Sequence, residues 1–253
     1  MIKDGDFLIL YGGRKAHYFL QYKPGLKFSS HLGEILLKEE LNYGDVIESH
    51  TGHKFLVLKP STSDFLLNIR RKTTIMYPKD IGYLILETGL RDGSIVAEVG
   101  SGSGGLTFVL ASIVGERGKV YSFERREDFH NLAKENLERY GLSDRVVFIL
   151  RDVAREGFGV QDLDIIFVDV PEPWEIVRWA RESLKGGGFW ASLSPNVEQV
   201  QKTVFELSRQ NFALIKTVEI LEREILVRDV GTRPKERMIS HTGYLTVARK
   251  VNL

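Results

Sequence analysis

The sequence predicts an α/β protein built on a parallel sheet that is covered on both faces, joined to a small N-terminal β-rich module. Between residues 95 and 250, short apolar segments that suit strands alternate with longer segments that suit helices. Most of the strand segments are almost continuously apolar, which is typical of strands buried on both faces. The glycine-rich stretch GSGSGG at 100–105 follows the first of these strands and predicts a nucleotide-like ligand at the carboxyl edge of the sheet.

The elements of the sheet follow in order from residue 95. Strands are predicted at 95–99, 119–123, 146–150, 164–169, 188–193, 213–221 and 244–250. Helices are predicted at 105–114, 126–140, 173–184 and 196–210. The helix at 126–140 has the clearest apolar stripe, because its large side chains recur at helical spacing.

The first 60 residues contain short apolar runs separated by Gly, Pro, Asn and Asp, which predicts the β-rich module. Phe65, Leu66 and Ile69 are spaced as on a helix that closes on a basic triplet at 70–72. The predicted boundary therefore divides the chain into residues 1–72 and 73–253. A second helix is predicted at 81–86, with Asp80 as its N-cap and its end at Gly89.

Composition excludes several classes of protein. The chain has no cysteine, so disulfides, thiolate zinc sites and cysteine nucleophiles are excluded. The histidines show no metal-ligand spacing, and no metal is expected. No apolar run is long enough for a membrane span, and the N-terminus lacks the features of a signal peptide. We expect a cytoplasmic protein without a membrane anchor.

Charge is distributed unevenly along the chain. Residues 1–79 hold 12 Lys and Arg against 8 Asp and Glu, while residues 80–220 hold 16 against 22. The remaining segment, 221–253, holds 7 against 4. Two interpretations stay open: the basic flanks bind a polyanion, or they are solvated faces of a charge-rich protein.

The glycine stretch fits two cofactors. It satisfies GxGxxG, so a nicotinamide dinucleotide is one candidate, and S-adenosylmethionine (AdoMet) is the other. Glu124, at the end of the next strand, suits ribose hydroxyls in either case. Glu98 favours AdoMet, because a carboxylate there can organise the loop and the cationic methionine end but would repel a pyrophosphate. A structural role at the strand end is the alternative for Glu98.

Three further residues lie where chemistry is expected. Asp152 ends the third strand and can accept a hydrogen bond from an adenine amine, although capping a helix is its alternative role. Asp169 ends the fourth strand and suits a base that takes a proton from an amine being methylated. Tyr77, in MYPKD, can reach over the mouth of the crevice, with loop packing as its alternative.

Taken together, these motifs resemble the tRNA adenine-N1 methyltransferases of the TrmI type. The resemblance rests on the order and spacing of seven segments along nearly the whole chain. They are MYPKD at 76–80, EVGSGSGGLT at 98–107, FE at 123–124, RDV at 151–153, DVPEPW at 169–174, SPNVEQV at 194–200 and SHTGYL at 240–245. HLGE at 31–34 in the β-rich module is similar too.

The resemblance implies a class I AdoMet-dependent methyltransferase with a Rossmann-like seven-stranded sheet whose last strand is antiparallel. It implies methyl transfer to N1 of adenine in the tRNA T-loop, at position 58 and, as in archaeal members, at 57, by a homotetramer. Alternatives are a methyltransferase with another substrate and a nicotinamide-dependent oxidoreductase. The expected cofactor-binding residues are Glu98, Gly100, Ser101, Gly102, Ser103, Gly104, Gly105, Leu106, Glu124, Asp152 and Asp169. The expected catalytic residues are Asp169 and Tyr77.

Overall fold

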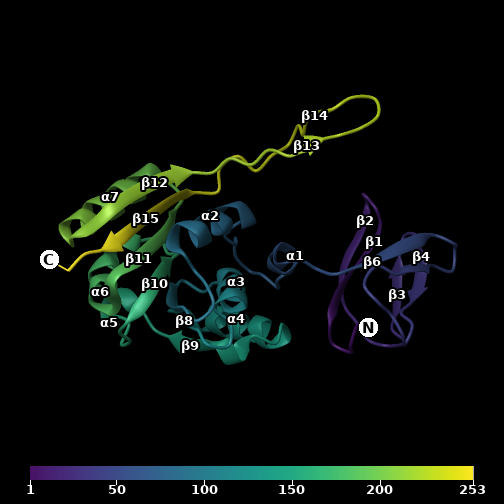
Figure 1. The fold of residues 1–253 in the computed structure, drawn as a ribbon, viewed down its shortest axis with the longest axis horizontal. Coiled ribbons are helices and arrows are strands. Elements are labelled where there is room, and N and C mark those ends of the chain that lie inside the picture. The colour runs from purple at the N-terminus through teal and green to yellow at the C-terminus, as the bar shows by residue number, and fades with distance from the viewer. Residues whose placement is uncertain (253) are drawn as a thin grey trace. The chain divides into compact units, whose positions relative to one another are not determined.

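The chain divides into two compact units, Met1–Asn68 and Ile69–Leu253. The computed structural model describes residues 1–252 (Figure 1). In that range no helix is both long enough and apolar enough to cross a membrane.

The first unit is β-rich. It contains a four-stranded antiparallel sheet in the order β2-β1-β6-β5 and a separate hairpin, β3-β4. Its elements are β1 Phe7–Gly13, β2 Ala16–Gln21, β3 Lys27–Ser30, β4 Gly33–Leu36, β5 Val46–Glu48, β6 Lys54–Leu58 and helix α1 Thr62–Leu67. Along β6 burial alternates, with Phe55 and Val57 buried, so one face of the sheet forms the core of this unit.

Helix α1 is shorter than the sequence predicts. It begins at a capping box in which the Ser61 and Asp64 side chains each bond to the other's main-chain N–H. It ends at Leu67, and the N–H and side-chain amide of its C-cap Asn68 both donate to the Asp64 carbonyl oxygen. These bonds close the last turn, and the basic triplet at 70–72 lies outside the helix.

The second unit contains a seven-stranded sheet in the order β12-β15-β11-β10-β7-β8-β9. Its strands are β7 Ile95–Val99, β8 Lys119–Glu124, β9 Val146–Leu150, β10 Leu163–Val168, β11 Leu184–Ser194, β12 Phe212–Glu219 and β15 Tyr244–Lys250. Its helices are α2 Pro78–Thr88, α3 Gly105–Val114, α4 Glu127–Arg139, α5 Val153–Glu156, α6 Val177–Ser183 and α7 Val197–Arg209, with 3-10 turns η1 Ser143–Arg145 and η2 Pro173–Glu175.

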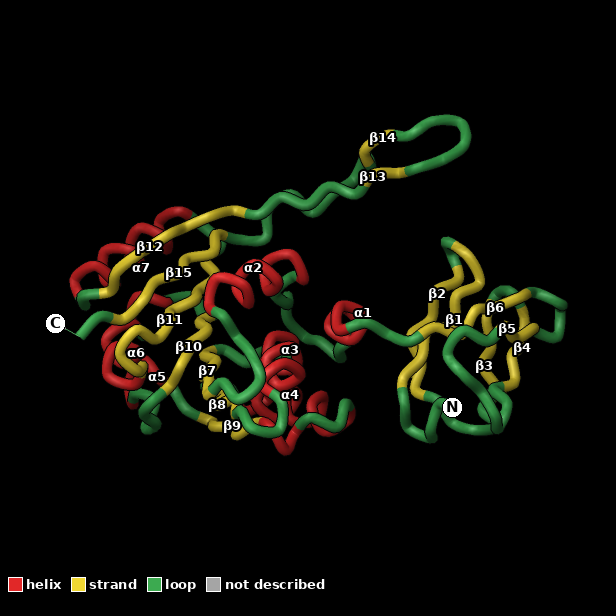
Figure 2. The backbone as a smooth tube through the Cα atoms, viewed as in Figure 1, coloured by secondary structure: helices red, strands yellow, loops and turns green. Residues whose placement is uncertain are grey.

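The sheet confirms the predicted fold class. Strands β7 to β11 pair in parallel, and β15 is antiparallel to both β11 and β12. Helices α2, α3 and α4 lie on one face, and α5, α6 and α7 lie on the other (Figures 1 and 2). The chain passes from β7 to β8 on one side and returns to β10 on the other side of β7. Such a switch point opens a crevice at the carboxyl ends of the strands.

Two predicted helices differ in detail. The segment predicted as one helix at 173–184 is a 3-10 turn followed by α6, and strand β11 starts directly after it at Leu184. The prediction of Asp80 as an N-cap was wrong. Helix α2 starts at Pro78, whose ring suits the first helical position, and extended Tyr77 is the N-cap. Asp80 is inside the first turn and fully buried.

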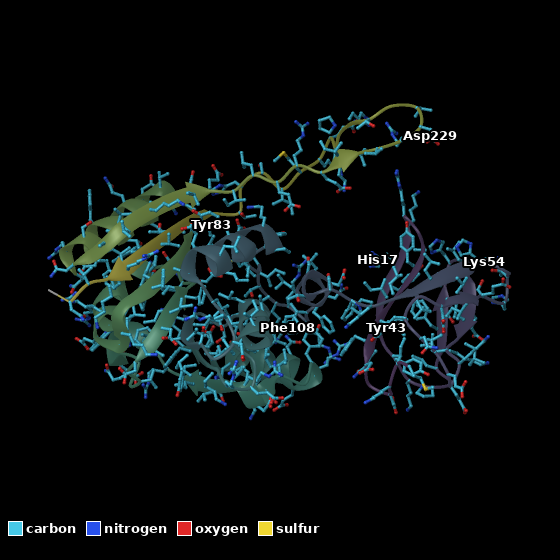
Figure 3. All side chains as sticks on the ribbon, in the orientation of Figure 1. His17, Tyr43, Lys54, Tyr83, Phe108 and Asp229 are labelled. Carbon is cyan, nitrogen blue, oxygen red and sulfur yellow. The ribbon has the colours of Figure 1, made fainter. Side chains whose placement is uncertain are left out.

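The sequence did not predict the arm between β12 and β15. Here the chain leaves the sheet as two long adjacent segments that carry the short strands β13 Ile225–Leu226 and β14 Arg233–Pro234 (Figures 1 and 2). Asp229 lies near its tip (Figure 3). Almost every residue of the arm is exposed, including apolar side chains such as Val230.

Candidate active site

A cavity of about 540 Å³ opens at the carboxyl ends of β7, β8, β9 and β10. This is the edge at which the switch point predicts a ligand. The predicted site residues that line it are Glu98, Gly100, Ser101, Gly102, Ser103, Gly105, Leu106, Glu124, Asp152 and Asp169. The structure therefore brings together side chains from four strands and from the loop before α3.

The glycine loop forms because the main chain must turn close to a neighbouring strand. Gly100 has φ +95° and donates its N–H to the Phe123 carbonyl oxygen at 2.8 Å. A Cβ atom at Gly100 would collide with the carbonyl oxygen of Asp169. Only glycine satisfies both requirements, so this position brings β7 and the end of β10 into contact at the cavity.

Glu98 is the most deeply buried carboxylate in the cavity wall, with 1% of its surface exposed. Its Oε2 accepts hydrogen bonds from Thr107 Oγ1 at 2.5 Å and from Ser122 Oγ at 2.8 Å. Its Oε1 is also buried and has no hydrogen-bond partner among residues 1–252. Burial raises the pKa of Glu98 to about 7, although the two hydroxyl donors act to lower this pKa.

Glu124 fixes the glycine loop from the next strand. Its Oε2 accepts from the Gly102 N–H, and its Oε1 accepts from the Arg126 N–H, both at 3.0 Å. These two bonds hold the carboxylate still at the cavity wall. Each carboxylate oxygen retains a lone pair that can accept a further hydrogen bond from a ligand hydroxyl.

Asp152 has the helix-capping role that the sequence left open as its alternative. It caps the short helix α5, because its Oδ1 accepts from the Ala154 N–H at 3.2 Å. It also lines the cavity, and Arg155 Nε lies 3.4 Å from its Oδ2.

Asp169 directly follows β10 and lines the same cavity. Its N–H donates to the Val99 carbonyl oxygen at 2.9 Å, which fixes the Asp169 backbone against the end of β7. Burial raises the pKa of Asp169 to about 6. The carboxyl group is therefore predominantly ionised at neutral pH and keeps some affinity for a proton.

Among residues 1–252, the lining of this cavity does not include Tyr77 or Gly104. Tyr77 caps α2, and its neighbour Met76 lines the cavity instead. Gly104 caps α3 with φ +81°, and a Cβ atom there would lie 3.1 Å from Ala133 Cα. Gly104 therefore permits close packing of α3 against α4.

Sequence reasoning missed the two hydroxyls that hold Glu98. Ser122 pairs with Glu98 in the parallel register of β7 and β8, so matching the two predicted strands would have placed it there. Thr107 lies in the first turn of α3, and no sequence pattern singles it out.

The cavity also has a cationic side, where the Arg126 guanidinium lies 3.9 Å from the centroid of the Phe129 ring.

The basic flank near the N-terminus is confined to a short segment. The first unit holds eight Lys and Arg and eight Asp and Glu, so it has no net charge. The exposed triplet Arg70, Arg71 and Lys72 lies just beyond it. The Lys72 N–H donates to Ser103 Oγ at 3.2 Å, which places this segment beside the cavity.

Within the described range 1–252, no group of three or more acidic or histidine side chains is arranged to hold a metal ion. Two basic side chains of the arm are paired with acidic side chains. Arg233 contacts Glu236 at 2.8 Å, and Lys235 contacts Glu224 at 2.7 Å.

Comparison with known proteins identifies the family. The family model described as tRNA methyltransferase complex GCD14 subunit matches residues 52–232. The tRNA (adenine(57)-N(1)/adenine(58)-N(1))-methyltransferase TrmI of Methanocaldococcus jannaschii is 36% identical over 96% of this chain and 94% of its own. The chain belongs to the TrmI family of tRNA methyltransferases. The TrmI of Thermus thermophilus, named for adenine 58 alone, is 32% identical over 96% of both chains.

Solved structures agree with the assignment to the TrmI family. The TrmI of Aquifex aeolicus superposes with a TM-score of 0.84 at 30% identity, covering 100% of this chain and 99% of that one. A Thermotoga maritima protein, named a SAM-dependent O-methyltransferase, superposes with a TM-score of 0.92 at 37% identity and covers 100% of this chain and 95% of that one. The likeness includes the N-terminal β module as well as the sheet.

Proposed function

We propose that this protein transfers a methyl group from AdoMet to N1 of adenine in the T-loop of tRNA, at position 58 and also at position 57. The observation that carries the proposal is a pair of carboxylates with raised pKa values, the buried Glu98 and the partly buried Asp169, in the same cavity of a TrmI-family chain. Position 57 is included because the M. jannaschii relative is named for both adenines.

The cavity suits AdoMet. The unpartnered Oε1 of Glu98 would accept from the cofactor's ammonium group, which compensates the cost of burying this carboxylate. Glu124 would accept from the ribose hydroxyls, and Asp152 from the adenine amine. Gly104 would act indirectly, by setting the position of α3. When bound, AdoMet supplies a methyl group that is electrophilic because it is attached to a sulfonium ion.

Asp169 would act on the target adenine. As N1 gains a methyl group the ring becomes positive, and the ionised Asp169 carboxylate would accept a hydrogen bond from the exocyclic amine and offset that charge. Its raised pKa of about 6 also allows it to accept a proton from the amine. No metal is required for these steps.

Most of the RNA substrate would be held outside the cavity, and only the target nucleotide would enter it. N1 lies on the base-pairing edge of adenine, so the nucleotide must swing out of the folded T-loop to reach Asp169. Tyr77, next to the cavity-lining Met76, is our candidate stacking partner, and the exposed triplet at 70–72 would bind phosphates. We further propose a homotetramer that acts in the cytoplasm.

Two alternative activities predict different products. A nicotinamide-dependent oxidoreductase is disfavoured, because Glu98 in the cavity wall would repel a pyrophosphate. A methyltransferase with another acceptor is the stronger alternative, since the similar T. maritima protein is named an O-methyltransferase. The methylated atom therefore has to be identified directly.

The test is to incubate the protein with an unmodified tRNA transcript and isotope-labelled AdoMet, then to map the label by nuclease digestion and mass spectrometry. We expect N1-methyladenosine at position 58 and at 57. Matched transcripts with uridine at 57, at 58 or at both assign the sites. A label on a ribose oxygen, or none on tRNA while hydroxylated small molecules are methylated, would contradict the proposal.

A further inference from the structure

A buried polar cluster outside the cofactor cavity joins two segments that are far apart in the sequence. Lys79 Nζ donates to Asp80 Oδ1 at 2.7 Å and to Thr242 Oγ1 at 2.5 Å. The Thr242 hydroxyl in turn donates to Asp80 Oδ2 at 2.7 Å. The Lys79 side chain is 7% exposed and that of Asp80 is 0% exposed. The three side chains thus form a closed ring of hydrogen bonds with little access to water.

One side of this cluster is connected to the cofactor cavity. Lys79 and Asp80 belong to the first turn of α2, directly after the buried residues Ile75 and Met76. Both of those residues line the cavity. Tyr77, between them and the cluster, caps the helix in an extended conformation. Fixing Asp80 therefore fixes the cavity wall and Tyr77 together.

The other side is connected to the edge of the sheet that carries Asp169. Gly243 is packed so closely that a Cβ atom there would lie 2.5 Å from Leu193 Cδ1, and Tyr244 pairs with Ser194. Two residues earlier in β11, Ser192 pairs with Val168 of β10, the residue before Asp169.

The segment that carries Thr242 is also held by its neighbour. His241 Nε2 lies 2.9 Å from the Pro195 carbonyl oxygen, and its Nδ1 lies 2.7 Å from Glu219 Oε1. Thr242 is therefore anchored at the carboxyl end of β11, beside strand β10, which Asp169 directly follows.

We propose that Lys79, Asp80 and Thr242 are positioning residues that hold the start of α2 at a fixed distance from Asp169. A buried ion pair is a poor source of net stability, because the desolvation cost offsets the attraction between the charges. It does impose a unique geometry, since each partner is left unsatisfied if the two segments separate. The cluster would thus hold an adenine between Tyr77 and Asp169 in reach of the methyl donor.

This inference rests on the proposed function only where it concerns turnover. Thr242→Val is the main test, because valine matches the shape of threonine but cannot bridge Lys79 and Asp80. Thr242→Ser is the matched control, because it keeps the hydroxyl. Two measurements are made on each full-length protein: hydrogen exchange of the amides in 75–81, and steady-state methylation of tRNA with AdoMet titration.

We expect Thr242→Val to raise hydrogen exchange at 75–81. It should also lower kcat about tenfold, because a misplacement of about 1 Å in the active site is costly, while the KM for AdoMet stays within about threefold. Thr242→Ser should resemble the wild type in both measurements. Unchanged exchange or unchanged kcat in Thr242→Val overturns the inference, as does equal impairment of Thr242→Ser. A wild-type protein that binds AdoMet but does not methylate tRNA would refute the proposed function, and the exchange measurement would still decide whether the cluster fixes the start of α2.

Discussion

Thr107 donates a 2.5 Å hydrogen bond to Oε2 of Glu98, and the second oxygen of that carboxylate has no partner anywhere in the described part of the chain. The Glu98 side chain is therefore held in one orientation although one of its two oxygens lacks a hydrogen bond. Its orientation comes from Thr107 on α3, the helix that follows the glycine loop, and from Ser122 on β8. Such an arrangement costs free energy unless a ligand donates the missing hydrogen bond.

The first prediction concerns AdoMet affinity. Burial raises the pKa of Glu98 to about 7, and only the ionised form attracts the ammonium group of the cofactor. The dissociation constant, measured by calorimetry, should fall as pH rises from about 6 to about 7.5 and level off as the α-amino group itself loses its proton near pH 8.

Glu98→Gln removes the charge that this attraction requires. It should weaken AdoMet binding by about tenfold or more at pH 7.5, because a charge-assisted hydrogen bond is removed, and it should flatten the pH dependence between about pH 6 and about pH 7.5. Glu175→Gln, on an exposed residue of the same cavity, is the control. Equal affinities for the wild type and Glu98→Gln would remove Glu98 from the cofactor site.

The second prediction concerns the stability of the free protein. A carboxyl group whose pKa is raised in the folded state binds more protons there than in the unfolded chain, so stability falls as pH rises between the two pKa values. For Glu98 this window extends from 4.5 to about 7. The decrease is at most roughly 3 kcal/mol, at 1.36 kcal/mol per pKa unit.

Urea denaturation at several pH values measures this effect. The free energy of unfolding of the wild type should decrease from about pH 5 to about pH 8, and Glu98→Gln should show a smaller decrease. Saturating AdoMet should restore stability at the higher pH. If the free energy of unfolding depends on pH in Glu98→Gln as it does in the wild type, the titration of Glu98 is not the cause of the decrease.

The sequence predicted the secondary structure best where a local pattern alone determines it. Strand β7 and helix α3 have the predicted bounds, because an apolar run, a glycine turn and a helix start are all local features. Asp80 was misassigned because its hydrogen-bond partner Thr242 is distant in sequence. The strands of the arm were missed for a related reason: β13 and β14 are two residues each and bury little apolar surface that a pattern could reveal.

The third prediction separates packing from backbone strain at two glycines. Gly104 and Gly141 both have positive φ, +81° and +70°. A Cβ atom at Gly104 would crowd Ala133 and Leu137, whereas one at Gly141 would meet no atom of residues 1–252 within 4 Å apart from those of its own chain neighbours. Gly141→Ala should cost about 1 kcal/mol of unfolding free energy from strain alone.

Gly104→Ala should cost about 2–4 kcal/mol, because crowding adds to the strain. It should also weaken AdoMet binding, since α3 carries Gly105 and Leu106 into the cavity. Thermal or urea unfolding of both variants checks the difference. If the two substitutions cost the same, close packing of α3 on α4 is not what requires glycine at position 104.

The fourth prediction concerns RNA binding by the exposed triplet at 70–72. Neutralising Arg71 and Lys72 together should weaken tRNA binding and reduce the slope of log affinity against log salt by about one unit for each phosphate that the variant no longer binds. Lys235→Gln is the control, because Lys235 is already paired with Glu224 in the arm. Filter binding or fluorescence anisotropy over a salt series measures both. An unchanged slope in the double variant would assign the triplet to solvated surface.

The last prediction addresses the reaction itself. Asp169 must be ionised to accept a hydrogen bond from the adenine amine, and burial raises the pKa of Asp169 to about 6 in the free protein. With AdoMet saturating, the kcat/KM for tRNA should therefore increase with pH and reach half its maximum near pH 6.

Asp169→Asn keeps the size of the side chain but removes the charge that offsets the methylated ring. The turnover rate should fall by about a hundredfold or more, whereas AdoMet affinity should change little, since Glu98 and Glu124 carry the cofactor contacts. Single-turnover methylation of tRNA and calorimetry with AdoMet separate the two effects. A variant that retains wild-type turnover would show that the amine is not held by Asp169, and a variant that no longer binds AdoMet would place this carboxylate in the cofactor site instead.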